Sequence, residues 1–119
     1  MGLDYIVEYV KLHTVTGRIL TFDYPNWTKT NLHGPNTPHR LDGPAIIFHS
    51  GTEMWYLNGL IHRIDGPAVT YKNGTGLNLW YLHGKGIKND DQQIETWIKT
   101  ENIDLKTEEG QMAFVLRWS

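Results

Sequence analysis

Two short polar clusters could do chemistry, because they place the same residue types at the same spacing. Each cluster reads His-Arg-x-Asp and runs on into Gly-Pro-Ala, at residues 39–45 and again at residues 62–68. An aspartate before Gly-Pro can accept backbone N–H groups in a turn, and the arginine can pair with the aspartate of its own or the neighbouring unit. On a second interpretation, the arginines and histidines of both units line one groove and bind an anion such as a nucleotide or RNA. The candidate residues for this second role are His39, Arg40, His62 and Arg63.

Two aromatic pairs follow the polar clusters, Trp55-Tyr56 in the first unit and Trp80-Tyr81 in the second. Side chains alternate along a strand, so one ring of each pair should fill the core and the other should be at least partly exposed. The rings could pack across strands within the sheet. They could instead form an interface hot spot or a base-stacking platform beside arginine. Trp55, Tyr56, Trp80 and Tyr81 are therefore candidate binding residues for a partner or an anionic ligand.

Few routes to catalysis are open to this sequence. The chain has no cysteine, which excludes a thiol nucleophile, a disulfide framework and thiolate metal sites. Its six histidines form no compact metal motif, and no nucleophile elbow or phosphate loop is present. We expect no catalytic residue, no metal and no cofactor. The remaining enzyme hypothesis is a metal-dependent nuclease or hydrolase with His39 or His62 as ligand and Asp42 or Asp65 as its partner.

The polar clusters belong to a tandem repeat, which must position them. Residues 39–45 recur after 23 positions, and the Trp-Tyr-Leu segment at residues 55–57 recurs after 25. The apolar segments 45–49 and 68–72 predict strands, and segments 52–57 and 77–82 predict the returning strands. Asn58-Gly59 and His83-Gly84 predict tight turns with positive φ. Each unit is thus a β-hairpin plus a linking turn, and the units must stack or extend one antiparallel sheet.

The flanking segments complete the expected fold. Segments 4–12 and 18–24 predict an N-terminal hairpin, the proline-rich segment 25–38 predicts an irregular loop, and residues 31–34 resemble a degraded earlier unit. A helix capped by Asp90 or Asp91 should bury Ile94, Trp97 and Ile98 and end near Asn102. Thr107 should cap a second helix with an apolar stripe of Met112, Val115 and Leu116, and Trp97 and Trp118 should anchor both helices.

The expected fold class is therefore α+β: a mostly β protein in which an antiparallel sheet of repeated hairpins is capped by two short C-terminal helices. The 119 residues fit a single domain, with the N-terminal hairpin and loop at 1–38, two tandem repeats at 39–87 and the helical cap at 88–119. The net charge of −2 is too balanced for a general polyanion binder. No apolar run approaches the roughly 20 residues of a membrane span, and no signal peptide is evident, so we expect a soluble intracellular protein without membrane contact.

The two repeat units, with their His-Arg-x-Asp-Gly-Pro-Ala and Trp-Tyr-Leu-(Asn/His)-Gly segments, resemble a repeat of small bacteriophage and large-virus proteins. That repeat is similar in style to MORN-type β-hairpin repeats. The tail, with Trp97, residues 102–105 and Arg117-Trp118, resembles the C-terminal cap of such phage proteins. The resemblance implies a viral accessory protein in the cytoplasm of an infected bacterium, and it carries over no catalytic residues.

These observations favour a non-enzymatic phage accessory protein. We expect it to bind and inhibit a host bacterial protein such as a component of a defence system. The first alternative is a sponge that sequesters a nucleotide-type signalling ligand, and the second is the metal-dependent hydrolase. Sheet edges left open by short hairpins could also pair in a homodimer.

Overall fold

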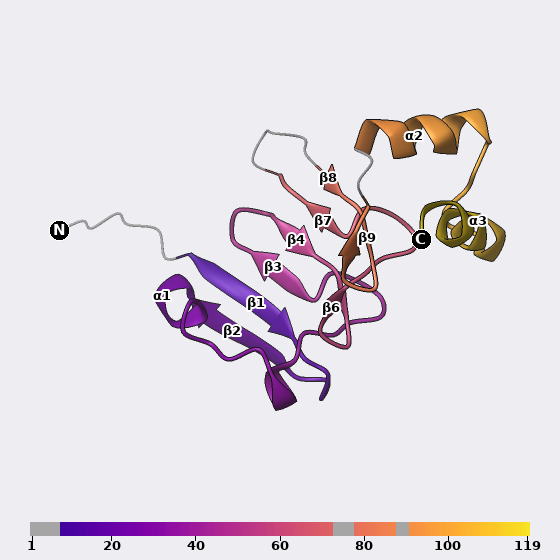
Figure 1. Ribbon diagram of the computed structural model, residues 1–119. Coiled ribbons are helices and arrows are strands. Elements are labelled where there is room, and N and C mark those ends of the chain that lie inside the picture. The colour runs from indigo at the N-terminus through magenta and orange to yellow at the C-terminus, as the bar shows by residue number, and fades with distance from the viewer. Residues whose placement is uncertain (1–7, 73–77, 88–90) are drawn as a thin grey trace.

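The computed structural model describes residues 8–72, 78–87 and 91–119. Over these residues the chain is a small α+β protein with a six-stranded antiparallel sheet, two small two-stranded hairpins and a pair of C-terminal helices, which confirms the expected class (Figure 1). Predictions for residues 4–7, the turn at residues 73–74, Leu77 and a helix cap at Asp90 lie outside the described residues. None of the described helices is long and apolar enough to cross a bilayer.

The large sheet runs in the order β2-β1-β3-β4-β7-β8. Its strands are β1 (Tyr9–His13), β2 (Ile19–Asp23), β3 (Ile46–Phe48), β4 (Glu53–Met54), β7 (Val69–Thr70) and β8 (Asn78–Leu79). The small hairpins pair β5 (Tyr56–Leu57) with β6 (Leu60–Ile61) and β9 (Tyr81–Leu82) with β10 (Lys85–Gly86). The helices are α1 (Tyr24–Trp27), α2 (Asp91–Thr100) and α3 (Glu108–Trp118), with a 3-10 turn at Gly34–Asn36.

The register aligns one aliphatic row across the large sheet. Directly opposed residues of neighbouring antiparallel strands point to the same face. The row consists of Leu20, Leu12, Ile46, Met54, Val69 and Leu79. Two of its buried members, Leu12 and Ile46, join Val10 in a first core cluster, against which Trp27 and Phe48 pack. One face of the sheet is therefore apolar from β2 to β8.

Each predicted returning strand is divided by its tryptophan. The Trp55 N–H donates to the Ala68 carbonyl at 2.8 Å, which continues the pairing of β4 with β7. The Trp55 carbonyl instead accepts from the His62 N–H at 3.0 Å, which begins the pairing of β5 with β6. The strand thus changes partner at Trp55 and enters the small hairpin. The two small hairpins close with positive φ at Asn58-Gly59 and at His83-Gly84, which confirms the predicted turns.

The N-terminal hairpin supplies the first strand of the repeat array. The His13 N–H donates to the Ala45 carbonyl at 2.7 Å, and the His13 carbonyl accepts from the His39 N–H at 3.0 Å. Trp55 makes the same two bonds one unit later, so His13 occupies the position of Trp55. The interpretation of residues 31–34 as an earlier unit is wrong, because His33 has an extended backbone with φ −117° and the segment runs into the 3-10 turn. Residues 31–34 resemble the turn segment of the repeat in sequence but do not adopt the backbone conformation of its turn.

The two C-terminal helices cover the last small hairpin and its neighbouring residues. Ile94 of α2 and Phe114 of α3 are fully buried with Trp80 and Leu82 in a second core cluster. Trp97 and Trp118 pack edge to face with ring centroids 6.0 Å apart, as the anchor prediction required. In Figure 1 the helices lie at the opposite end of the molecule from β1 and β2. The helices were expected to pack over the sheet; they do so only beside the last repeat unit, against Trp80 and Leu82.

The predicted apolar stripe of α3 is wrong at two of its three residues. Met112 is 65% exposed and Leu116 is 77% exposed. The buried positions are Gly110 and Phe114, one helical turn apart. Gly110 faces the backbone of Asp104 so closely that no side chain fits between them. This contact sets the rotation of the helix, and Met112 and Leu116 turn to solvent. The Thr107 cap was predicted correctly, because its hydroxyl accepts from the Gly110 N–H. Asn102, with φ 54°, lies two residues beyond the last residue of α2, close to the predicted helix end.

The segment 25–38 is more ordered than the expected irregular loop. Asp23 caps α1 by accepting the Asn26 N–H at 2.8 Å. This short helix places Trp27 between Phe22 and Phe48, with both ring centroids 6.0 Å away. Trp27 therefore packs against the first core cluster. The proline in the first turn of α1 favours the short helix that carries this tryptophan.

Candidate functional site

The repeated arginines hold the linking turns of their own units. The Arg63 Nε–H donates to Asp65 Oδ1 at 2.8 Å, and Nη1 donates to the Pro67 carbonyl at 3.0 Å. The guanidinium lies 3.8 Å from the centroid of the Trp55 ring. On its other side it covers Gly66, where a Cβ would lie 2.9 Å from the Arg63 Cζ. The arginine is thus sandwiched between ring and backbone, and its planar fork fits this slot as a lysine would not.

Arg40 repeats this arrangement against a different ring. Its Nε–H donates to Asp42 Oδ1 at 3.1 Å and its Nη1 to the Pro44 carbonyl at 3.2 Å. The Arg40 hydrogen bond lowers the pKa of Asp42. In place of a tryptophan, Arg40 meets His13, whose Nε2 accepts from Nη1 at 3.1 Å. Burial first, and then the charges of Arg40 and Lys11, lower the pKa of His13.

The repeated histidines brace the turns of the small hairpins. His39 Nδ1 accepts the Asn58 N–H at 2.9 Å, and His62 Nδ1 accepts the His83 N–H at 2.8 Å. The rings of His62 and His83 also stack, with centroids 4.1 Å apart. Burial first, and then His83, lower the pKa of His62. Each histidine therefore ties its cluster to the positive-φ turn residue of the nearby hairpin.

Four of the eight candidate binding residues meet in one hollow, called here the repeat hollow. It has a volume of about 280 Å³ and is lined by Arg40, Leu41, Trp55, Leu57, His62, Arg63, Ile64, Asp65 and Gln111. The indole Nε1–H of Trp55 is buried and has no hydrogen-bond partner within the described part of the chain. Gln111 shows that α3 contributes to this wall. The repeat hollow thus joins both units to the helical cap.

The other four candidates lie elsewhere. Trp80 is a core residue, 4% exposed, and its Nε1–H donates to Asp91 Oδ1 at 2.7 Å. In the second unit Trp80 is therefore the ring that fills the core, and it is not accessible to a partner, whereas Trp55 of the first unit is half-buried. Tyr56 packs against the first core cluster, and Tyr81 lies against Gly86. Burial, and next Tyr81, raises the pKa of Tyr56. His39 borders a different hollow, beside His13 and Arg18.

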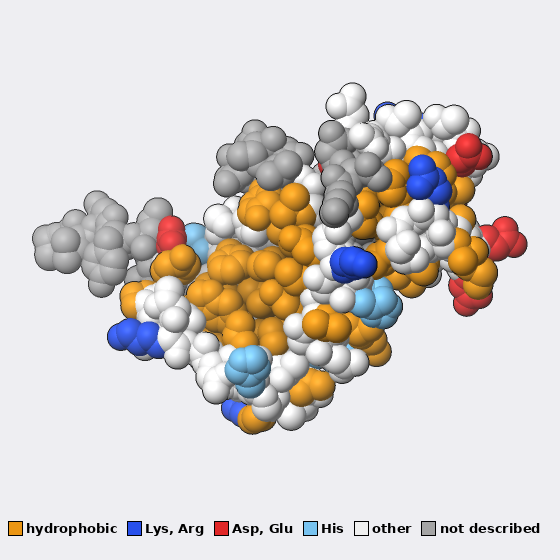
Figure 2. Space-filling view, viewed as in Figure 1, with side chains coloured by type: hydrophobic (Ala, Val, Ile, Leu, Met, Phe, Trp, Pro, Cys, Tyr) orange, Lys and Arg blue, Asp and Glu red, His pale blue; other side chains and the backbone are white. Residues whose placement is uncertain are grey.

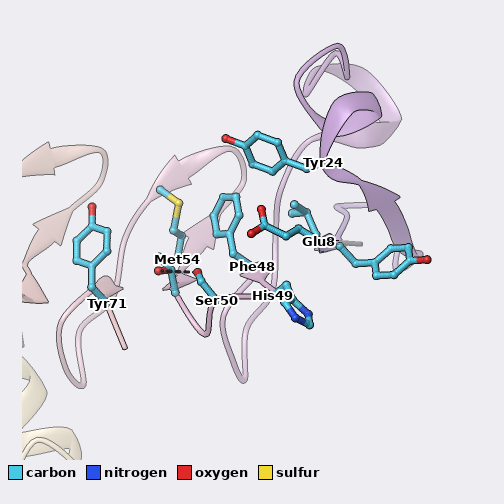
Figure 3. A pocket seen from close by; sticks show the side chains of 10 residues that line it. Glu8, Tyr24, Phe48, His49, Ser50, Met54 and Tyr71 are labelled. Carbon is cyan, nitrogen blue, oxygen red and sulfur yellow. Dashed lines mark hydrogen bonds between the residues drawn. The ribbon is translucent and has the colours of Figure 1, made fainter. Parts of the chain in front are cut away.

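A second hollow, called here the sheet-face hollow, was not found by sequence reasoning. It has a volume of about 350 Å³ and is lined by Glu8, Tyr9, Val10, Tyr24, Phe48, His49, Ser50, Thr52, Met54 and Tyr71. Figure 3 shows Phe48 and Met54 side by side between Tyr71 and Tyr24, with the Glu8 carboxylate near Phe48. Figure 2 shows hydrophobic side chains gathered over β3 and β4. The only sequence signal for it is the shared face of the aliphatic row.

Neither metal-ligating clusters within the described residues nor known relatives define the candidate site. Residues 8–72, 78–87 and 91–119 contain no group of three or more His, Asp or Glu side chains placed to hold a metal ion. No family model, curated protein or solved structure matches the chain. The candidate site is therefore defined by the geometry of the two hollows alone.

The lowered pKa values of His13 and His62 predict that stability falls in mild acid. A folded pKa below the unfolded value of about 6.5 means that the unfolded chain binds more protons between the two values. The free energy of unfolding should then be highest above about pH 6.5 and decline as the pH falls toward the folded pKa values. Urea unfolding at several pH values measures this slope, and the double variant His13→Gln with His62→Gln should flatten it. NMR titration that places both folded pKa values at or above about 6.5 would contradict the prediction.

Proposed function

We propose that this chain is a non-enzymatic binding protein that engages a protein partner through the sheet-face hollow. The observation that carries the proposal is an aromatic-lined hollow on the apolar face of the large sheet, built by Tyr24, Phe48, Met54 and Tyr71. Apolar surface of this kind, rimmed by polar residues, marks interaction sites. Tyr24, at 47% exposed, is accessible to a partner. Tyrosine is also a residue type enriched at interface hot spots.

The identity of the partner follows from the resemblance of the repeats. They resemble those of phage accessory proteins, so we propose a host bacterial protein, such as a component of a defence system, as the partner in the cytoplasm of an infected cell. Binding would inhibit that protein by covering its surface. The repeats would serve as the scaffold that presents the hollow, because their arginines and histidines are engaged in their own turns.

Affinity capture with surface variants tests this proposal. The immobilised chain should retain a specific protein from bacterial lysate, and Tyr24→Ala should reduce retention at least tenfold, as expected for an interface hot spot. Leu116→Ala is the control, because Leu116 is 77% exposed on α3, away from the hollow. Equal retention by wild type and Tyr24→Ala would place the interface elsewhere. If Trp55→Ala reduces retention and Tyr24→Ala does not, the partner binds at the repeat hollow instead.

A second candidate function rests on the repeat hollow. There Arg40, Arg63 and His62 line the same hollow as Trp55, a combination that could stack a base and hold a phosphate. Both arginines already pair with carboxylates, at 3.1 Å and 2.8 Å, which reduces the charge available to an anion. A nucleotide at 100 times its dissociation constant would raise the free energy of unfolding by about 2.7 kcal/mol. Thermal shift against a panel of nucleotides measures this directly.

A further inference from the structure

Among the described lining residues of the sheet-face hollow there is one acidic side chain and no lysine or arginine. That acidic side chain is Glu8. The His49 ring points away from Phe48 in Figure 3. Lys72, next in the chain to Tyr71, lies 3.7 Å from the Glu53 carboxylate, so its charge is already opposed. The hollow therefore presents a negative group to any occupant.

The aromatic rings near Glu8 also favour a positively charged occupant. Figure 3 shows the Glu8 carboxylate beside the Phe48 ring, with the Tyr24 ring above both. The faces of aromatic rings carry negative potential and attract ammonium and guanidinium groups within about 6 Å. Among the described residues, no ion pair to Glu8 is formed by a Lys or Arg of this chain. Carboxylate and rings are thus set to receive a positive charge from outside the molecule.

The hollow also suits the stem of a long side chain. Its floor holds Val10, Phe48 and Met54, and Val10 is only 1% exposed. Lysine and arginine bury their methylene stems on apolar surface while the charged head reaches a polar partner. A volume of about 350 Å³ is near the lower end of the roughly 300–1,000 Å³ of small-molecule sites, which fits one inserted side chain.

We propose that the protein partner inserts a lysine or arginine side chain into the sheet-face hollow. The stem lies on Phe48 and Met54, and the charged head meets the Glu8 carboxylate beside the Tyr24 ring. This inference rests on the proposed function and specifies the chemistry that the partner must present. Glu8 is then the specificity-determining residue, and the rings supply most of the contact area.

NMR titration with single amino-acid probes tests the proposal. N-acetyl-lysine amide and N-acetyl-arginine amide are compared with N-acetyl-norleucine amide, which has a similar stem and no charge. The readout is the indole N–H signal of Trp27, whose ring packs edge-on against Phe48 with centroids 6.0 Å apart. The charged probes should shift this signal and bind about three- to tenfold more tightly than norleucine amide. Glu8→Gln should remove that advantage, whereas Glu101→Gln, the same change at an exposed residue in the turn after α2, should preserve it.

The outcomes separate this proposal from the proposed function. If norleucine amide binds as tightly as the charged probes, or if Glu8→Gln changes nothing, cation recognition is overturned. The same holds if none of the probes shifts the Trp27 signal. The sheet-face hollow would remain a docking site in each case, provided that Tyr24→Ala still weakens capture of the partner. If Tyr24→Ala leaves capture unchanged, the docking site itself is lost.

Discussion

Gly110→Ala is expected to destabilise the protein by about 3 kcal/mol or more, although the same change inside a helix ordinarily stabilises by about 0.5–1 kcal/mol. A Cβ at this position would overlap the Asp104 carbonyl oxygen and lie 2.5 Å from its carbonyl carbon. Both are backbone atoms, so no side-chain rotation relieves the overlap. The helix would have to move away, which breaks the bond from the Gly110 N–H to the Thr107 hydroxyl at 3.0 Å and loosens Phe114 in the core.

Urea unfolding followed by circular dichroism measures this loss, and two controls isolate its cause. Gly17→Ala tests backbone conformation alone, because Gly17 has φ +82° but nothing within 4 Å of its missing Cβ. That variant should lose about 1–2 kcal/mol. Met112→Ala, at a side chain 65% exposed on the same helix, should change stability by less than about 0.5 kcal/mol. A Gly110→Ala protein as stable as wild type would show that α3 does not approach Asp104 this closely.

Trp80→Ala is expected to cost about 3–5 kcal/mol, whereas Trp55→Ala should cost about 1–2 kcal/mol. Trp80 packs against Phe114 with ring centroids 5.4 Å apart, and its indole N–H donates to the first residue of α2, Asp91. Removing the ring opens a cavity in the second core cluster and removes the hydrogen bond that joins the last repeat unit to α2. Trp55 is only half-buried, its indole N–H has no partner within the described residues, and its ring stacks on the Arg63 guanidinium at 3.8 Å.

A third variant separates the two contributions of Trp80. Trp80→Phe keeps an aromatic ring against Phe114 but removes the N–H that reaches Asp91 at 2.7 Å, so it should lose less than Trp80→Ala. Circular dichroism at 222 nm is the suitable probe in urea, because each variant also changes the tryptophan fluorescence. Equal losses for Trp80→Ala and Trp55→Ala would contradict the assignment of Trp80 to the cap and Trp55 to the repeat hollow.

The structure also separates two kinds of role for the repeated residues. The sequence shows Arg40 and Arg63 in identical settings, and both do pair with the aspartate of their own unit. One guanidinium nevertheless stacks on Trp55, and the other donates to His13. His13 lies outside the repeated segments, and the pairing of β1 with β3, continued by its backbone bonds to Ala45 and His39, places it there. The neighbouring strand therefore sets the environment of each arginine.

The sequence alone determined the features that depend on near neighbours in the chain. The hairpin turns at Asn58-Gly59 and His83-Gly84 follow from the few residue types that accept positive φ. The Thr107 cap follows from a hydroxyl three residues before a free N–H group. These interactions join residues that are at most a few positions apart, so the local order of residue types is enough to predict them.

Tertiary structure decided which side chains are covered. Trp55 and Trp80 occupy matching positions in the repeat, but α2 and α3 bury one of them and leave the other beside the repeat hollow. The sheet-face hollow likewise exists because α1 places Tyr24 beside strands that are distant in sequence. Periodicity correctly assigned the buried face of α2, where Ile94, Trp97 and Ile98 pack into the second core cluster. It could not distinguish Trp55 from Trp80, because their burial depends on which elements pack over each of them in the fold.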